Sequence, residues 1–332
     1  MTVLCTADWH LNDNPRDRYR HEFQPYLLQL IERHSVTHLL ILGDLTDEKD
    51  HHGAVLVNEI VGYLEKLARV CQVTVLTGNH DCIDPSNPFF AFTSNLPNVM
   101  WITKPMSERG YADLGNVLFL PHTRDHRLDW ETLDEERLFN WVFTHNTFTG
   151  AKSSSGRELA GIPISALPRD TPVISGDVHV PQNVGPVTYA GAPYTIDFGD
   201  TFKPRVILIE DQVVCSVSVP GPQKRLIKAI DGADARRKLA SISPGDMVKV
   251  RMGWDSTKFE EWVLAKKELM NWAVKEGIAL KGVEPILDGK AKPKKYKVPG
   301  KPASDTEVLA DYCEANAVSK LLSKVGRILL KG

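Results

Sequence analysis

The chain has 332 residues and a formal net charge of -2, and 42% of its residues are hydrophobic. This composition is ordinary for a globular protein, and the near-neutral charge excludes a general attraction to nucleic acid or to an anionic membrane. The five cysteines have neither CxxC nor paired spacing, which argues against a disulfide framework and a zinc–cysteine site. The N-terminus lacks the long apolar run of a signal peptide or a membrane span, so we expect a cytoplasmic protein without membrane contact.

The first half of the chain alternates short apolar runs with amphipathic stretches. The apolar runs lie within residues 2–10, 38–47 and 73–81, and each ends in polar side chains. Residues 23–34 and 53–70 have apolar side chains at helical spacing, which predicts β–α–β units and an α/β sheet buried on both faces. The polar side chains that end the runs are therefore expected along one edge of the sheet, where open α/β sheets bind ligands.

The composition changes twice further along the chain. Residues 114–219 contain short strand-like runs between Gly and Pro residues, which predict a second set of strands packed over the first. Residues 220–288 predict a small α/β domain, with strands at 245–254 and 278–287 and a helix at 257–277.

The last part of the chain predicts a linker and an amphipathic helix. Residues 289–303 are rich in basic residues, with Pro and Gly and no apolar period, which is typical of a linker. In residues 304–332 the apolar side chains fall near one helical face. They are Val308, Leu309, Tyr312, Leu321, Leu322, Val325, Leu329 and Leu330. Such a helix either docks on a partner protein, which we favour, or folds back on the main domain.

The polar side chains at the strand ends suit a centre with two metal ions. Mn²⁺ and Mg²⁺ favour oxygen ligands mixed with imidazole, and a two-metal centre needs one carboxylate that bridges the ions. Asp8 and His10 lie two residues apart and can face one metal, whereas Asp44 follows a glycine and is the natural bridging carboxylate. Asn79 offers a carbonyl oxygen to the second metal, and the adjacent His80 can act on a substrate as an acid or as an electrostatic partner.

The order of these motifs resembles that of the calcineurin-like metallophosphoesterases, and within them the SbcD-type nucleases of DNA double-strand-break processing. The resemblance rests on ADWH, GDLTD, GNHD, FTHNTF and SGDVHVPQ, with YAGAPYTIDFGD after them. By motif it covers the part of the chain up to residue 200, and the remainder only by domain order. It implies an α/β fold: a four-layer metallophosphoesterase β-sandwich flanked by helices in residues 1–219, then a small α/β capping domain and a C-terminal helical tail.

The resemblance also implies two divalent ions, for which Mn²⁺ is the expected metal and Mg²⁺ the alternative. The implied ligands of the first ion are Asp8, His10 and His179. The implied ligands of the second ion are Asn79, His145 and Asp177, with Asp44 bridging the two. His80 matches the histidine that helps to protonate the leaving group or to stabilise the transition state. The implied reaction is hydrolysis of a phosphodiester by water activated at the metals.

Asp177 departs from the family pattern, which has G-H-x-H where this chain has G-D-V-H. An aspartate can still give one oxygen to Mn²⁺ or Mg²⁺, so we interpret Asp177 as a substituted ligand. The change is expected to weaken the preference for softer metals and to reduce the Lewis acidity of the second ion. Because the side chain is shorter than histidine, a weak second site is the alternative.

Other polar residues near these motifs have simpler interpretations. Asp81 is expected to orient a loop or a histidine rather than to bind metal. Asp47 can contact the substrate or a metal-bound water, but it is equally suited to be the N-cap of the following helix. The remaining histidines near the motifs are interpreted as solvated loop residues: His51, His52, His122 and His126.

The sequence thus predicts a metal-dependent DNA nuclease, a hydrolase of DNA recombination and repair with exonuclease or endonuclease activity. By domain order, residues 220–288 would face DNA, and residues 304–332 would dock on an SbcC-type ATPase in an SbcCD-like complex. Whether the chain forms a homodimer stays open. The compact size resembles the recombination endonuclease small subunits of phages, which predicts a bacterial or phage-infected cytoplasm.

Two other functions stay open at this point. The same kind of metal site serves small-molecule and nucleotide phosphodiesterases, although the extension after the core favours the nuclease. The fold can also serve as a non-catalytic scaffold. Only one expected ligand is altered, however, and it is altered to another ligand type, which favours an enzyme.

Overall fold

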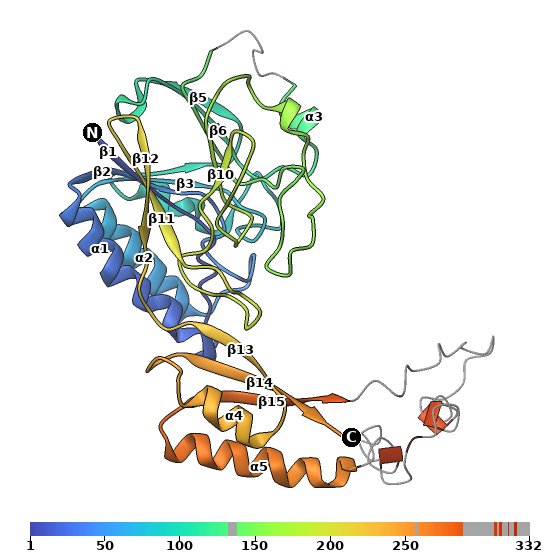
Figure 1. The fold of residues 1–332 in the computed structure, drawn as a ribbon. Coiled ribbons are helices and arrows are strands. Elements are labelled where there is room, and N and C mark those ends of the chain that lie inside the picture. Colours follow the sequence, from blue (N-terminus) through green and yellow to red (C-terminus); the bar gives the residue numbers. More distant parts are fainter. Residues whose placement is uncertain are drawn as a thin grey trace.

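The computed structural model describes residues 1–131, 138–255 and 258–287, and near the C-terminus residues 309, 310, 312, 313, 318, 322 and 323. The linker predicted at 289–303 lies outside the described residues, and so does most of the helix predicted at 304–332. Two large sheets form the upper part of the molecule in Figure 1, and a smaller sheet with two helices lies below them. Among the described helices, none has the length and apolar content needed to span a bilayer.

The first six-stranded sheet has the strand order β12-β11-β1-β2-β3-β4. Its strands are β1 (Thr2–Thr6), β2 (Val36–Ile41), β3 (Gln72–Leu76), β4 (Val99–Ile102), β11 (Arg205–Glu210) and β12 (Val213–Ser218). Strands β1 to β4 are parallel, and helices α1 (Phe23–Arg33) and α2 (Ala54–Ala68) lie between β1, β2 and β3 in the chain. These are the predicted β–α–β units, and the α/β fold is confirmed.

One face of this sheet packs against α1 and α2 (Figure 1). Leu4, Leu39 and Val73 pair across the three strands and lie in one buried cluster with Leu27 and Leu64 of the helices. Because side chains alternate along a strand, the neighbouring residues point to the opposite face, where the second sheet covers them. Burial on both faces explains why these strands are continuous apolar runs.

The second six-stranded sheet has the strand order β5-β6-β7-β8-β10-β9. Its strands are β5 (Met106–Arg109), β6 (Asn116–Leu120), β7 (Trp141–Thr144), β8 (Val173–Ser175), β9 (Gln182–Val184) and β10 (Val187–Tyr189). Phe119, Phe143 and Ile174 are buried in the cluster between the two sheets. The outer face packs against loop residues such as Phe148 and Leu167, so the fourth layer of the sandwich consists mainly of loops.

Short helices complete this part of the molecule. They are the 3-10 helices η1 (Pro15–Glu22), η2 (Phe89–Asn95), η3 (Tyr111–Asp113) and η4 (Ile164–Ala166), and the single-turn α3 (His126–Asp129). The first of these, η1, precedes α1 directly and carries the buried Arg20.

The smaller unit, which we call the cap, is a three-stranded parallel sheet of order β13-β14-β15. Its elements are β13 (Lys224–Ala229), α4 (Gly232–Leu239), β14 (Met247–Trp254), α5 (Phe259–Lys275) and β15 (Ala279–Leu287). Both helices lie on the side of the sheet that faces away from the two large sheets (Figure 1). Val248, Val250 and Trp262 are among the residues of their shared core.

Lys224 at the start of β13 joins the cap to the main domain. Its Nζ donates to Asp17 Oδ1 at 2.7 Å and to the carbonyl of Ile196 at 2.8 Å. Its backbone N–H donates to Thr195 Oγ1 at 2.6 Å. Lys249 of β14 adds a cation–π contact, with its Nζ 4.8 Å from the ring centre of Phe198. The face of the cap sheet without helices therefore turns toward the main domain.

Candidate metal centre

Side chains from both large sheets converge at the carboxyl ends of their strands. The residues that follow strands of the first sheet are Asp8, His10, Asp44, Asn79 and His80, and those that follow strands of the second are His145, Asp177 and His179. Asp8, His10, Asp44 and His145 are all at most 2% exposed. Buried polar groups of this density require partners or a ligand, because burying an unpaired charge is costly.

The backbone turns sharply where these side chains enter the cluster. Asp8, His10, Asp44 and Asp177 have positive φ values of 55°, 45°, 55° and 72°. This left-handed region is uncommon for residues with a side chain, although Asp and His adopt it more readily than most. Such turns concentrate at functional sites, where the surrounding structure holds them in place.

The glycines of the GD and GN motifs leave the space that the cluster occupies. Gly43 has a φ of 86°, and a Cβ added there would lie 2.2 Å from His145 Nδ1. A Cβ on Gly78 would lie 2.2 Å from Asp44 Oδ1. The two loops can approach the histidine and the carboxylate closely only because these positions carry no side chain.

His10 and His179 form the first half of the cluster. Their Nε2 atoms are 3.1 Å apart, and His10 Nε2 lies 3.4 Å from Asp44 Oδ2. His10 Nδ1 lies 3.2 Å from Asp47 Oδ1. Because an ionised carboxylate only accepts, Nδ1 is the protonated nitrogen of the neutral ring and the lone pair of Nε2 faces the cluster.

His145 forms the second half together with Asn79 and Asp177. Its Nε2 lies 3.1 Å from Asn79 Oδ1, 3.4 Å from Asp44 Oδ1 and 3.8 Å from Asp177 Oδ1. Its Nδ1 lies 2.5 Å from the carbonyl of Leu42, so Nδ1 donates to that oxygen. As in His10, the other ring nitrogen is left to face the centre of the cluster.

Asp44 lies between the two halves, and its two oxygens face different histidines. Oδ2 is near His10 and Oδ1 is near His145, while the backbone N–H of His80 donates to Oδ1 at 2.8 Å. Three sets of side chains bring possible ligand atoms within 4.8 Å of one another: Asp8, His10 and His179; His10, Asp44 and His80; and Asp8, Asp44 and His145. Asp8, His10 and Asp44 each belong to two of these sets, but among these Asp44 is the carboxylate whose two oxygens lie near different histidines, as expected of a ligand shared between two ions.

Several atoms of the cluster lack a protein partner that would explain their position. Within the described residues, Asp8 Oδ2 is buried without a hydrogen-bond partner. The Nε2 atoms of His10 and His179 face each other, and because His10 Nε2 carries a lone pair, His179 Nε2 either donates a hydrogen to it or shares a cation with it. The Asn79 oxygen lies among acceptors, and the amide finds donor bonds to Asp177 and Asp44 only in its opposite orientation. Divalent cations would satisfy all three positions, so the donor set fits metal ions.

The electrostatics of the cluster point the same way. Burial raises the pKa of Asp8 to about 7. Burial also acts to raise the pKa of Asp44, but the charges of His145 and His10 hold it well below its ordinary value. Burial acts to lower the pKa of His145, whereas Asp44 and Asp177 raise it well above the ordinary value. The carboxylates thus draw a positive charge to the centre, which a cation would supply in place of a proton.

Asp47 and Asp81 contact the cluster from outside. Asp81 is buried, and its carboxylate accepts the backbone N–H groups of Gly78, Leu45 and Asp44 at 2.7, 2.8 and 2.9 Å, so it ties the two glycine loops together. Asp47 does not cap the following helix, because α2 begins at Ala54 with Gly53 as its N-cap. That alternative is wrong: the Asp47 side chain is used to orient His10 instead.

The four loop histidines do not share one environment. His51 is exposed, as expected. His52 packs against Phe89 with ring centres 4.6 Å apart, and His126 packs against Trp130 at 5.6 Å. The His122 ring is 6.2 Å from that of His145, and its Nδ1 is buried. His52, His122 and His126 are partly exposed, so they are less solvated than expected, because neighbouring rings pack against one side of each.

Two residues near the cluster were not predicted from the sequence. Arg20 in η1 is 3% exposed and donates to the carbonyl of His10 and, at 3.2 Å, to Asp47 Oδ2. Thr147 donates to Asp177 Oδ2 at 2.5 Å. Thr147 stands two residues after His145 in the FTHNTF motif, which is a local signal, whereas nothing near Arg20 in the sequence marks it.

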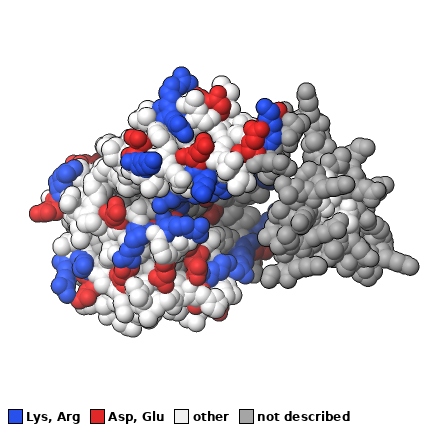
Figure 2. All heavy atoms as spheres, turned by 90° about the horizontal axis from the view of Figure 1, so that it is seen from below, with Lys and Arg blue, Asp and Glu red and all other residues white. Residues whose placement is uncertain are grey.

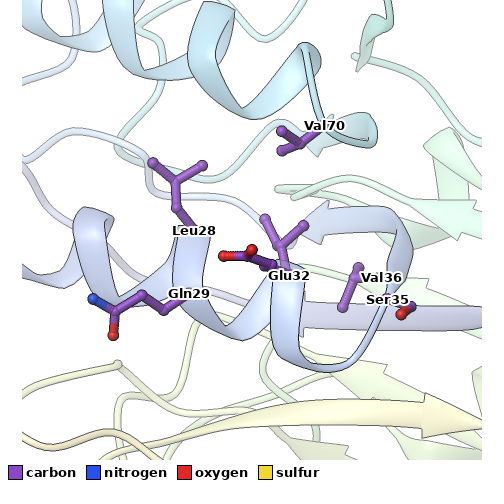
Figure 3. A pocket seen from close by; sticks show the side chains of 7 residues that line it. Leu28, Gln29, Glu32, Ser35, Val36 and Val70 are labelled. Atoms are coloured by element: carbon purple, nitrogen blue, oxygen red, sulfur yellow. The ribbon is translucent and has the colours of Figure 1, made fainter.

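A surface pocket elsewhere on the molecule is unrelated to this cluster. It is lined by Leu28, Gln29, Ile31, Glu32, Ser35, Val36 and Val70 (Figure 3). Val36 begins β2, whereas Asp44 follows the end of that strand, so the pocket lies at the opposite end of β2 from the cluster.

A family model for calcineurin-like phosphoesterases matches residues 1–181. This match covers more than half of the chain and includes every residue of the cluster. The chain therefore belongs to the calcineurin-like phosphoesterase family, whose members are metal-dependent hydrolases with a dinuclear metal site. The resemblance inferred from the motifs is confirmed at the level of this family.

Individual relatives are more distant. The chain is 31% identical over 93 residues to the SbcD component of nuclease SbcCD from Escherichia coli strain K12, covering 26% of this chain and 23% of the relative. It is 24% identical over 193 residues to the putative phosphoesterase 078R of Invertebrate iridescent virus 3, covering 55% of this chain and 54% of the relative. The chain thus spans less than two thirds of either relative.

Among solved structures, the nuclease MPE of Pseudomonas putida is similar at 15% sequence identity and a TM-score of 0.34. The similarity covers 67% of this chain and 78% of that chain.

Proposed function

We propose that the cluster holds two divalent cations and that the chain is a DNA nuclease. Asp8, His10 and His179 would hold the first cation. Asn79, His145 and Asp177 would hold the second, and Asp44 would bridge them. This assignment rests on the position of Asp44, because one of its oxygens faces His10 and the other faces His145. The mixture of oxygen and imidazole ligands suits Mn²⁺ and, as the alternative, Mg²⁺.

Two bound cations would supply Lewis acidity at the phosphoryl oxygens and would lower the pKa of water. The protein itself contributes a proton donor in His80. Its Nδ1 lies 2.9 Å from the carbonyl of Asp47, which can only accept, so Nδ1 carries a hydrogen. When the ring is protonated, Nε2 also carries one, and it can donate to the leaving oxygen or to the charge on the phosphoryl group.

The proposed substrate is DNA. Support comes from the similarity to the SbcD component of nuclease SbcCD and from the cap. On the cap face that turns toward the main domain, Lys228, Lys249 and Arg251 lie on neighbouring positions of β13 and β14, with Glu284 as a counter-charge. On the face that carries the helices, basic and acidic side chains are interspersed instead (Figure 2). Lysines and arginines gathered on one face suit contact with a phosphate backbone.

The first test is digestion of end-labelled linear and hairpin DNA with Mn²⁺, with Mg²⁺ and with chelator. Wild type should cut only with metal, and His80→Ala should lose about 10²- to 10⁴-fold in rate because it lacks the proton donor. His34→Ala is the matched control, since His34 follows α1 at the far end of the first sheet. Metal binding should be unchanged in both variants.

Three outcomes would contradict the proposal in different ways. Cutting that survives chelation, or that survives His80→Ala, removes the mechanism. Hydrolysis of bis-p-nitrophenyl phosphate without cleavage of DNA favours a small-molecule phosphodiesterase. A chain that hydrolyses neither substrate with either metal is a scaffold with the phosphoesterase fold.

The role of the cap can be separated from the chemistry. The slope of log DNA affinity against log salt concentration measures how many phosphates the protein neutralises. In the double variant Lys249→Gln, Lys228→Gln, this slope should become shallower by about one unit for each phosphate contact that is lost. Lys266→Gln with Lys275→Gln on α5 should leave that slope unchanged. Equal effects of the two pairs would show that the cap face does not touch the DNA.

We also propose that residues 304–332 dock on an SbcC-type ATPase. The support is the sequence pattern, in which the apolar side chains fall near one helical face. Leu322→Asp with Leu329→Asp should abolish co-purification of the full chain with such an ATPase, whereas Lys324→Asp should not. Retention of the complex by the leucine variant would refute this role.

A further inference from the structure

Two hydrogen bonds hold Asp177, which also has an unusual backbone conformation. Its Oδ2 accepts the hydroxyl hydrogen of Thr147 at 2.5 Å, and its backbone N–H donates to Asp8 Oδ1 at 3.1 Å. Its φ of 72° lies in the left-handed region, which is uncommon for a residue with a side chain. A carboxylate can otherwise rotate about its side-chain bonds, so these interactions select one orientation.

The Thr147 bond decides which oxygen of Asp177 faces the centre. Because Oδ2 is engaged by the hydroxyl, Oδ1 is the oxygen that lies 3.8 Å from His145 Nε2. Hydrogen bonds to an ionised acceptor are short and stronger than those between neutral groups. The carboxylate therefore presents one oxygen rather than two.

The same interactions place hydrogen-bond donors on two of the clustered carboxylates. Asp8, Asp44 and Asp177 all lie in the cluster. The Thr147 hydroxyl places a donor on the outer oxygen of Asp177. The Asp177 backbone N–H engages Asp8 Oδ1 and leaves Oδ2, the buried atom without a partner among the described residues, to face the cluster.

We propose that Thr147 is a positioning residue that sets the metal preference of the second cation position. The inference rests on the proposed two-metal site. With Asp177 held to one oxygen, that position has oxygens from Asp44, Asn79 and Asp177 and one imidazole nitrogen from His145. Oxygen-rich positions favour Mg²⁺ and Mn²⁺, whereas added imidazole favours Zn²⁺. Thr147 thereby keeps an aspartate in a place where its short side chain would otherwise be poorly held.

The test measures metal binding to the full, metal-free chain by isothermal titration calorimetry with Mn²⁺, Mg²⁺ and Zn²⁺. Wild type should bind two Mn²⁺ ions. Thr147→Val, which keeps the shape and removes the hydroxyl, should weaken the second Mn²⁺ about tenfold, as expected for the loss of a hydrogen bond to a charged group. The first Mn²⁺ should bind as before, and Thr147→Ser should restore the second.

The control is Thr149→Val, the same substitution at an exposed threonine whose hydroxyl donates to the carbonyl of Gly161 at 3.2 Å. It should bind both ions like wild type. Asp177→His should raise the affinity of the second position for Zn²⁺ relative to Mn²⁺, whereas Thr147→Val should lower affinity for Mn²⁺ more than for Zn²⁺. A merely structural role of Thr147 would change all metals alike.

The outcomes separate this inference from the proposed function. If wild type binds fewer than two Mn²⁺ ions, the two-metal assignment fails and Thr147 with it. If wild type binds two ions, and Thr147→Val binds them with the same affinities and the same ranking of Mn²⁺, Mg²⁺ and Zn²⁺, only the role of Thr147 is overturned. If Thr147→Val weakens every metal equally and Thr147→Ser does not restore binding, the residue supports the fold and not the preference.

Discussion

Strands β1 to β3 of the first large sheet and the strands of the cap sheet are parallel with helices between them, yet among the described residues only the large sheets end in a polar cluster. In the cap, Asp231 follows β13 just as Asp8 follows β1. The Asp231 carboxylate accepts the backbone N–H of Asp234 at 2.8 Å and caps α4. Asp8 instead keeps a buried oxygen without a partner in the described part of the chain. A carboxylate after a strand is therefore a site candidate only when local hydrogen bonds do not already use it.

The charged groups of the two regions differ in the same sense. Asp234 of the cap pairs with the exposed side chains of Arg237 and Lys238. Asp44 of the main domain is buried between two histidines. Exposed pairs contribute little to stability, whereas the buried cluster concentrates charge that needs a counter-ion. The described part of the cap thus pairs its charges with exposed partners, whereas the main domain buries several charges together.

The largest expected difference between the two regions is that between substitutions of Asp44 in the main domain and Asp231 in the cap. Asp44→Asn should lower hydrolysis by at least about 10³-fold, because an amide cannot bridge two cations as a carboxylate does. Asp231→Asn should leave activity and stability unchanged, because Asn is as good an N-cap as Asp. Hydrolysis of bis-p-nitrophenyl phosphate and the bound metal content measure the effect. Equal activity of the two variants would remove the distinction between the regions.

The glycines of the two regions provide the next test. Gly43→Ala should lower the free energy of unfolding by about 2 kcal/mol or more, because it combines a positive φ with a clash against His145. Gly232→Ala at the start of α4 should be neutral or slightly stabilising, since a Cβ there meets nothing within 4 Å. Urea denaturation of the metal-free chain compares them. A neutral Gly43→Ala would mean that the loop has more room than the structure shows.

The smallest expected effect concerns the junction between the regions. Lys224→Met should cost about 1 to 2 kcal/mol of unfolding free energy, because it leaves Asp17 and the carbonyl of Ile196 without their donor. Lys228→Met, at a more accessible position of the same strand, should change stability by less than about 0.5 kcal/mol. Thermal unfolding followed by circular dichroism distinguishes the two. Matching curves would show that the junction does not depend on Lys224.

Much of the main domain could be predicted because its signals are local. The apolar runs of β1, β2 and β3 and the helical spacing of α1 and α2 lie within short stretches of chain. In the cap, β14, α5 and β15 were predicted in the same way. Strand β13 and helix α4 were not, because KRLIKA and GADARRKL are short and highly charged. Their pairing with β14 and packing against its core decide their structure.

The sequence by itself determined which residue types stand at the strand ends, because a strand, a glycine turn and a polar residue are neighbours in the chain. Only the tertiary structure decided which of them meet. The backbone of Asp177 reaches Asp8 across 169 positions of sequence, and Arg20 reaches His10 and Asp47 through η1. Contacts of this kind depend on how distant segments of the chain pack together. The order of residues along one strand therefore does not specify which distant residue a side chain will contact.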